Sequence, residues 1–336
     1  MNKRYNGSMA FKTIRSPQMS FLEPSMDELV HKDHAYRKLL SIVDFSELCK
    51  PLHCLFKDFG RPGYHIESGF AALVLQWFED LSDRELERFL QENNAGKYFC
   101  GFTLREKTPD HSYFSALRKK IGTGKLAELF NLLGEKLKEK GLVSNVFTFV
   151  DASQMISKAA LWEERDKAIS QGIEKLNNTV VDKFAADKQA RFGCKGKTHY
   201  WFGYKRHVAA CMKQGFITKV AVTTANVTEA RALKHICPKE GMTIGDKAYC
   251  VKEAQRTLKA NGCHSGAILK NNMKQKNFQK DAFLSNIRMP YENIFSKMDK
   301  KVRYRGQAKA QFQGFMQALT FNFKRLLAIH APPLFT

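Results

Sequence analysis

The chain has 336 residues and carries 55 lysines and arginines against 33 aspartates and glutamates, a formal net charge of +22. Hydrophobic residues make up 43% of it, enough for a folded core, which excludes a largely disordered protein. The sequence has no run of about 18 apolar residues, and residues 1–20 lack the apolar stretch of a secretory signal. The 8 cysteines form no C-x-x-C pair, which argues against a zinc module. We therefore expect a cytoplasmic protein without a membrane partner.

The excess of positive charge indicates a polyanionic partner. It is concentrated toward the C-terminus, where residues 251–336 hold 16 lysines and arginines against 4 acidic residues. Basic side chains along a nucleic-acid backbone gain free energy by releasing counterions, whereas the sequence has no basic amphipathic stretch suited to a membrane surface. Nucleic acid is therefore the favoured partner. A generic basic surface is the alternative that charge alone leaves open.

The first part of the chain has the pattern of helices. Residues 1–24 are polar and predict a tail. Two capping boxes, in which a serine caps an amide and a glutamate reaches back, are followed by apolar residues at helical spacing. Helices are predicted near Ser25–Glu28 and over 66–79, 82–93, 110–121 and 125–138. We expect residues 25–144 to form an all-helical domain that binds DNA ends. The second and third helices fit either a DNA-reading helix-turn-helix or a plain helical hairpin.

After Gly141 the pattern changes to strands alternating with helices. Strands are predicted over 146–151, 199–212, 216–224, 242–244 and 265–270, and helices over 162–178, 229–236 and 251–260. The polar, basic stretch 179–198 is expected to be a loop. This order predicts an α/β domain on a mixed sheet, over residues 145–330.

Two aspartates, Asp151 and Asp246, each follow an apolar strand-like run. Carboxylates on rigid backbone suit Mg²⁺, which prefers oxygen ligands, and two such ions clamp the attacking and leaving oxygens of a phosphodiester. Glu292 is the candidate third acid, with Pro290 expected in the first turn of a helix. Structural alternatives remain open, since an aspartate after a strand is often a turn former and a glutamate in a first turn often only complements the helix dipole.

Several motifs then carry a family resemblance. Phe149-Val150-Asp151-Ala152-Ser153 resembles the first acidic motif of bacterial insertion-sequence transposases of the DDE type. Later motifs of the insertion-sequence-five group are matched, in order, by Ala190–Gly193, Phe202–His207, Thr224–Val227, Gly245–Tyr249, by Arg288, Glu292 and Phe295, and by Arg303–Gly306. Asp110–Phe114 extends the resemblance into the helical part, so that it covers about residues 30 to 327.

The resemblance implies an RNase H-like catalytic domain after an all-helical N-terminal domain. Asp151, Asp246 and Glu292 would bind Mg²⁺, for which Mn²⁺ substitutes. The implied reaction is cleavage at the ends of the element and transfer of the freed 3′-hydroxyl into target DNA. Double-stranded DNA, as terminal inverted repeats and target, would be the partner of a homodimer in the bacterial cytoplasm.

The resemblance and the charge pattern together nominate DNA-binding residues. Arg288, four residues before Glu292, matches the basic residue expected to hold a phosphate. The other candidates are Arg191, Lys195, Lys197, Lys297, Lys300, Arg303 and Arg305. Ser285 and Asp299 depart from the family pattern, which often has a tyrosine and a lysine there. Tyr304 fits either stacking on an unpaired base or a half-buried place in a solvated loop.

Two further function classes stay open. A host-adopted DNA-binding protein would keep the fold without cutting DNA, and the intact set of three acids argues against it. A nuclease that cuts without joining would use the same two-metal site, so detecting joined products is what separates it from a transposase. A repressor has no need for three placed acids and ranks last.

Overall fold

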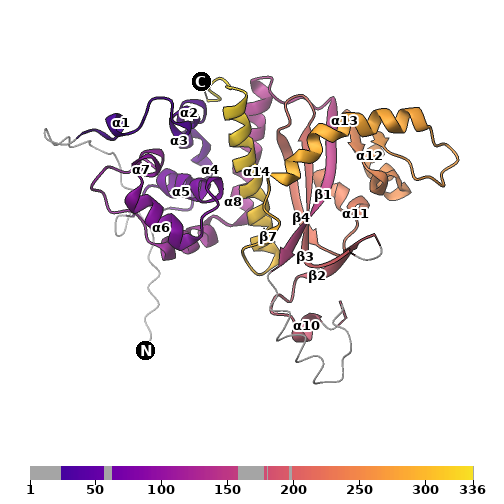
Figure 1. Ribbon diagram of the computed structural model, residues 1–336, viewed down its shortest axis with the longest axis horizontal. Helices are drawn as coiled ribbons and strands as arrows, with labels where there is room; N and C mark the ends of the chain where they lie inside the picture. The colour runs from indigo at the N-terminus through magenta and orange to yellow at the C-terminus, as the bar shows by residue number, and fades with distance from the viewer. Residues whose placement is uncertain (1–23, 57–62, 158–177, 180, 197–198, 336) are drawn as a thin grey trace. The chain divides into compact units, whose positions relative to one another are not determined.

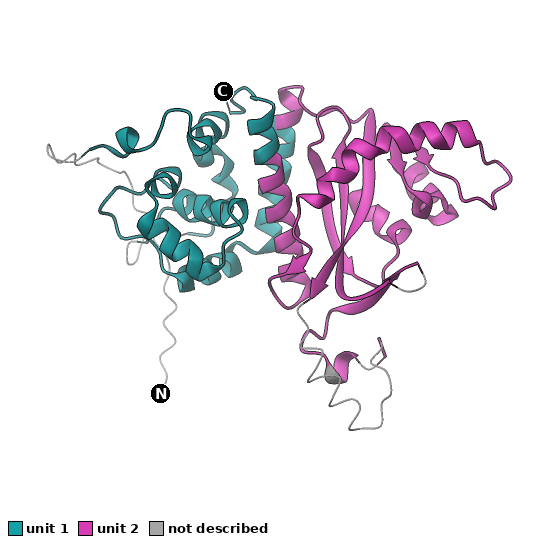
Figure 2. Ribbon diagram, viewed as in Figure 1, with its two compact units in different colours: residues 1–136, 323–336 teal, residues 137–322 magenta. Residues whose placement is uncertain are grey.

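The computed structural model describes residues 24–56, 63–157, 178–179, 181–196 and 199–335 (Figure 1). The chain divides into two compact units (Figure 2). The helical unit is Met1–Lys136 with Phe323–Thr336, and the sheet unit is Leu137–Asn322. The predicted domain bounds were 25–144 and 145–330. The units instead divide the chain after residues 136 and 322, and both of these points lie inside long helices. Of the predicted tail, only Pro24 lies within the described residues.

The sheet unit is built around one long central strand, β1 (Phe147–Ser157). β1 is antiparallel to β3 (His199–Cys211), which is antiparallel to β4 (Ile217–Thr224). On its other side β1 is parallel to β5 (Met242–Gly245), and β5 is parallel to β6 (His264–Ala267). Two short strands complete the sheet, β2 (Arg191–Lys195) beside β3 and β7 (Lys301–Val302) beside β1. The mixed sheet of order β4-β3-β1-β5-β6 confirms the predicted α/β, RNase H-like class.

Helices cover both faces of this sheet (Figure 1). The remaining elements of this part of the chain are α10 (Val181–Phe184), α11 (Glu229–Ile236), η1 (Lys247–Cys250), α12 (Lys252–Ala260), α13 (Phe278–Ser296) and α14 (Gln307–Ala328). Successive side chains of a strand point to opposite faces. Val150 packs in one cluster with Leu233 of α11 and Leu258 of α12. Ile244 of β5 packs in another cluster with Leu284 of α13.

Two predictions about local structure were wrong. Pro290 is not in the first turn of a helix: α13 begins at Phe278, after an Asn277 cap whose side chain accepts from the Lys280 amide. A proline inside a helix costs about 3 kcal/mol, so the local rule favoured a helix start there. The stretch 179–198 is not a plain loop, since it contains α10 and β2. The sequence did not predict β2 because this strand is largely polar and pairs with β3 alone. The predicted helix 162–178 lies outside the described residues, apart from Asn178.

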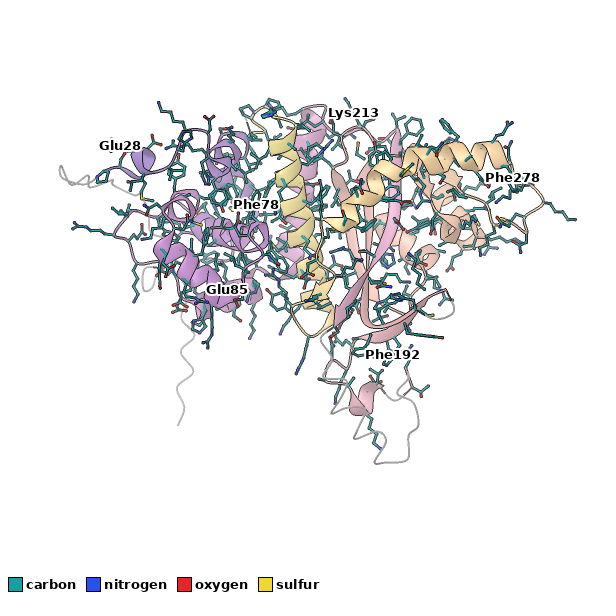
Figure 3. The ribbon with its side chains drawn as sticks, viewed as in Figure 1. Glu28, Phe78, Glu85, Phe192, Lys213 and Phe278 are labelled. Carbon is teal, nitrogen blue, oxygen red and sulfur yellow. The ribbon has the colours of Figure 1, made fainter. Side chains whose placement is uncertain are left out.

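Phe278, the first residue of α13, stands out from the sheet unit (Figure 3). Its side chain is 75% exposed, and the Lys276 ammonium lies 5.0 Å from its ring centroid. The N-terminal end of α13 is therefore solvent-facing, while its inner side packs on the sheet.

The helical unit follows the local signals in the sequence. Its helices are α1 (Met26–Leu29), α2 (Ala35–Ile42), α3 (Phe45–Leu48), α4 (Lys50–His53), α5 (Ile66–Phe78), α6 (Asp83–Glu92), α7 (Asn94–Phe99) and the first part of α8 (His111–Glu139). Both predicted capping boxes are present, at Ser25 and at Ser82. Gly122, with φ 63°, interrupts α8 between the two helices that the sequence predicts. None of the described helices is long and apolar enough to cross a membrane.

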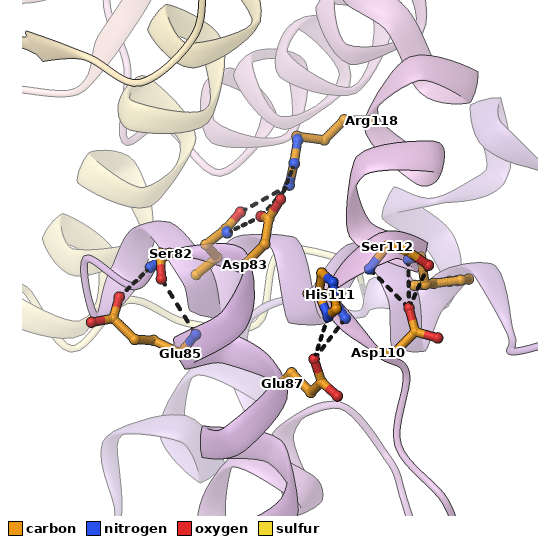
Figure 4. Close-up of polar contacts among 10 residues, drawn as sticks. Ser82, Asp83, Glu85, Glu87, Asp110, His111, Ser112 and Arg118 are labelled. Carbon is orange, nitrogen blue, oxygen red and sulfur yellow. Dashed lines mark hydrogen bonds and ion pairs between the residues drawn. The ribbon is translucent and has the colours of Figure 1, made fainter. Parts of the chain in front are cut away.

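Polar contacts fix α6 against α8 in the helical unit (Figure 4). The Arg118 guanidinium donates to both carboxylate oxygens of Asp83, at 2.8 and 2.5 Å. Glu87 accepts from the backbone amide of His111 at 3.0 Å, and its carboxylate lies 2.7 Å from the His111 ring. These contacts hold α6 against α8, and a helix-turn-helix and a structural hairpin are equally compatible with them.

Replacing Gly203 by alanine should destabilise the sheet unit by about 2 kcal/mol or more. Gly203 has φ 145°, and a Cβ there would lie 2.2 Å from the carbonyl oxygen of Met155 on β1. Gly134→Ala is the matched control, because a Cβ at this position in α8 meets nothing within 4 Å. Alanine should stabilise that helix by roughly 0.5–1 kcal/mol. Chemical unfolding of both variants checks this, and equal stabilities would contradict it.

Candidate active site

The register of two parallel strands brings Asp151 and Asp246 together. Phe149 of β1 pairs with Ile244 of β5, and each aspartate lies two residues further along its chain. Adjacent strands are about 4.8 Å apart, and residues two apart point to the same face of a sheet. The two aspartates therefore lie side by side, on the face that carries Phe149 and Ile244.

The two aspartates differ in their backbone. The sequence predicts that this strand ends at Asp151. β1 instead continues to Ser157, and Asp151 pairs with Val208 of β3. The apolar run in the sequence ends at Asp151, but the pairing of β1 with β3 continues beyond it. Asp246 does follow its strand, and its carboxylate accepts a hydrogen bond from the Ala248 amide at 2.9 Å. Asp246 is thus also the cap of η1, so the turn-former alternative describes part of its role.

Helix α13 places Glu292 over the same face of the sheet. The ring centroid of Phe149 is 5.9 Å from that of Tyr291 and 6.5 Å from that of Phe295. The Arg288 guanidinium lies 5.7 Å from the Phe149 ring centroid. Glu292 is 55% exposed in its side chain, and Arg288 pairs with it at 3.3 Å, one helical turn away.

The pKa of Asp151 responds to the other charged groups of this face. Burial raises the pKa of Asp151 to about 6, and the nearby carboxylates of Asp246 and Glu292 raise it further, while the Ala152 amide and Arg288 act to lower it. Tyr249, fully buried behind the acids, also has a pKa well above its usual value, because of burial first and then of Asp151 and Asp246. The face therefore concentrates negative charge around a partly desolvated carboxyl group.

The donor set suits a hard divalent cation, whereas the side-chain positions are only partly arranged for one. Carboxylate oxygens are the ligands that Mg²⁺ prefers, and a cation would favour the charged form of Asp151, which burial first and the nearby carboxylates second disfavour. In the part of the chain that is described, no three His, Cys, Asp or Glu side chains form a group ready to hold a metal ion. Glu292 instead engages Arg288.

Most of the predicted DNA-binding residues near the C-terminus lie on the connection between α13 and α14, which we call the basic connection (residues 297–306). Lys297, Lys300 and Arg305 are exposed there, whereas Arg303 is half-buried. Arg288, by contrast, is only 7% exposed and belongs to the acidic site.

Buried polar side chains that sequence reasoning missed hold the basic connection. The Gln313 amide group donates to the carbonyl of Lys301 at 2.8 Å and accepts from the Arg303 amide at 2.9 Å. Gln317 donates to the carbonyl of Asp299 at 3.1 Å, and Arg206 donates to the same carbonyl and to Ser153 of β1. The one signal in the sequence for these contacts was Arg206, a charged residue in the middle of a predicted strand.

The remaining predicted residues lie apart from the acids along the sheet. Arg191 and Lys195 are on β2, which is separated from β1 by β3. Arg191 is half-buried and pairs with Asp182 at 3.2 Å, while Lys195 is exposed. Lys197 lies outside the described residues.

Two family models match the chain. The model described as "Transposase domain (DUF772)" matches residues 24–120, and the model described as "Transposase DDE domain" matches residues 178–323. The second match includes Asp246 and Glu292 and begins after Asp151. No curated protein matches the chain. The solved structure of the Mos1 transposase paired-end complex with left transposon end shares 8% identity over 83% of this chain and 82% of that chain, with a TM-score of 0.17, too low to compare the folds in detail.

Asp151→Asn should stabilise the metal-free protein at pH 7.5 by on the order of 2 kcal/mol. The pKa of the folded carboxyl group is about 6, above its ordinary value of 3.8, so the folded state binds more protons between these values. Its contribution to stability is therefore full below about pH 4 and is lost as the pH rises through 6. Denaturant unfolding in EDTA from pH 4 to 8 measures the gain, with the exposed Asp33→Asn as control. Parallel stability curves for wild type and Asp151→Asn would contradict it.

Proposed function

Since the chain belongs to the DDE transposases of insertion sequences, and is therefore an enzyme of nucleic-acid phosphoryl transfer, we propose that Asp151, Asp246 and Glu292 form its metal-binding catalytic set. The reaction we propose is cleavage of DNA at the ends of the element, followed by transfer of the 3′-end into target DNA. The observation that carries this is the strand register that sets Asp151 beside Asp246, on the face covered by the helix of Glu292.

The family uses divalent metal ions, and we propose Mg²⁺, with Mn²⁺ as a substitute, at two sites. Bound there, the ions would supply Lewis-acid stabilisation of the attacking and leaving oxygens of the phosphodiester. Asp151 lies within the long strand β1 and Asp246 directly follows β5, so both hold their oxygens on rigid backbone, which would fix where the DNA lies. Glu292 would rotate its side chain away from Arg288 and bind a metal ion together with the two aspartates.

Arg288 has a distinct part in this proposal. It pairs with Glu292 and lowers the pKa of Asp151, so it offsets the charge of the acids while the site is empty of substrate. Once Glu292 turns away, its guanidinium is free to donate to an oxygen of the scissile phosphate. Because it is buried, we assign it to that single phosphate and not to DNA at large.

The DNA partner would be bound over a wider surface. We propose that the basic connection, with Lys297, Lys300, Arg303 and Arg305, holds the DNA backbone next to the acids. Arg191, Lys195 and Lys197 would bind phosphates further away. The helical unit would read the terminal inverted repeat.

The order of the motifs supports membership of the insertion-sequence-five-like group. We further propose a homodimer, which holds two transposon ends, acting on DNA in the bacterial cytoplasm.

Asp151→Asn, Asp246→Asn and Glu292→Gln should each lower end cleavage more than about 100-fold, which exceeds the loss expected for residues that only orient a metal ligand, while leaving DNA binding intact. The substrate is a labelled duplex made from the DNA flanking the gene, in Mg²⁺ or Mn²⁺. Joined products on a supercoiled target would distinguish transfer from simple cutting.

Glu253→Gln is the matched control for Glu292→Gln. Glu253 lies on α12, is 56% exposed in its side chain and pairs with Arg231 at 3.7 Å, so it matches Glu292 in exposure and in having an arginine partner. Full cleavage by Asp246→Asn, or an equal loss in Glu253→Gln, would contradict the assignment.

A further inference from the structure

The exposed residues along the middle of α13 include Ser285 and the acidic Glu292. The others, which carry no charge and which we call the neutral face, are Ala282, Phe283, Asn286, Met289, Pro290 and Asn293. Phe283 is 64% exposed and Met289 is 60% exposed. These are large apolar side chains in contact with water on a chain of net charge +22.

Packing inside the sheet unit does not account for the neutral face. The inner side of α13 buries Leu284, Arg288 and Ile294 against the sheet. Pro290 has no amide hydrogen, so the carbonyl of Asn286, four residues earlier, loses its usual helical donor. The neutral face therefore presents apolar side chains together with a backbone acceptor.

Exposed lysines lie beyond both ends of the neutral face. Lys270, Lys274 and Lys280 lie at the N-terminal end, and Lys297 and Lys300 at the C-terminal end. A second copy of the chain docked along α13 would bring lysines against lysines. DNA complements this pattern, because phosphates would meet the lysines while bases meet the apolar middle.

The neutral face also lies next to the acids. Met289 and Glu292 are three residues apart and so are neighbours on the helix surface. At 1.5 Å per residue, Met289 is about 4.5 Å and Phe283 about 13.5 Å along the axis from Glu292. Bases of one strand are spaced by about 3.4 Å, so these distances span roughly one and four nucleotides.

We propose that the neutral face of α13 contacts unstacked bases of the transposon end beside the cleaved bond, with Met289 and Phe283 packing on base faces. This rests on the proposed function, whose DNA substrate it takes further. Apolar side chains that enter a base stack partly unstack it, and stacking on an aromatic side chain tolerates any base sequence. The neutral face would thus hold the DNA end open without reading its sequence.

The test measures DNA binding of the full chain in EDTA, so it does not depend on cleavage. The probe is a duplex made from the DNA flanking the gene, with 2-aminopurine at each of the first nucleotides of the end in turn. Wild type should raise the fluorescence at one or two positions. Phe283→Ala should abolish that rise at one of them and weaken binding about 5- to 100-fold.

An abasic site tests whether the contact is with a base. Placed at the responding position, it should weaken wild-type binding as much as Phe283→Ala does, and combining the two should cost no more than either alone. Phe278→Ala is the matched control, since Phe278 is an exposed phenylalanine of the same helix outside the neutral face, and it should bind normally.

Three results would overturn the inference. They are additive losses in the combined experiment, an equal loss in Phe278→Ala, and a change of oligomeric state in Phe283→Ala with unchanged DNA affinity. The last would assign the neutral face to a second copy of the chain. A fluorescence response without cleavage in Mg²⁺ would instead count against the proposed function alone.

Discussion

Repulsion between carboxylates that the backbone does not allow to separate is the constraint on which the site depends. Parallel pairing of β1 with β5 fixes Asp151 beside Asp246, and α13 brings a third acid over the same face. Like charges so placed in a partly desolvated environment disfavour full ionisation. Burial raises the pKa of Asp151, the repulsion raises it further, and Arg288 offsets part of the charge by pairing with Glu292. A divalent cation would relieve the same repulsion, and it would join the stability of the site to its chemistry.

The fold also buries several polar side chains behind the basic connection. Arg206 and Gln313 are fully buried, and Gln317 is nearly so. Burying such groups costs free energy unless they are hydrogen-bonded, and here their partners are carbonyls and amides of residues 299–303. The contacts tie the basic connection to α14, and Arg206 also ties it to β1, the strand that carries Asp151. The position of the basic connection relative to Asp151 is therefore fixed by buried hydrogen bonds.

Much of the fold could be predicted because the signals were local. The capping boxes at Ser25 and Ser82 need only four consecutive residues, and the order of strands and helices predicted the mixed sheet. The predictions failed where neighbours distant in sequence decide the structure. β1 continues past Asp151 because β3 pairs with it, and Pro290 sits inside α13 because the helix packs on the sheet. The place of Arg206 in the middle of a strand, between Lys205 and His207, was a signal that it is unusual, but the sequence does not reveal which loop it holds.

The most direct test of the central claim is anomalous diffraction from crystals of the full chain grown with Mn²⁺ and a transposon-end duplex. We expect Mn²⁺ bound between Asp151 and Asp246, with Glu292 turned from Arg288 toward the metal. Manganese bound elsewhere on the protein, with both aspartates lacking a metal and Glu292 still paired to Arg288 in the DNA complex, would contradict the proposed site.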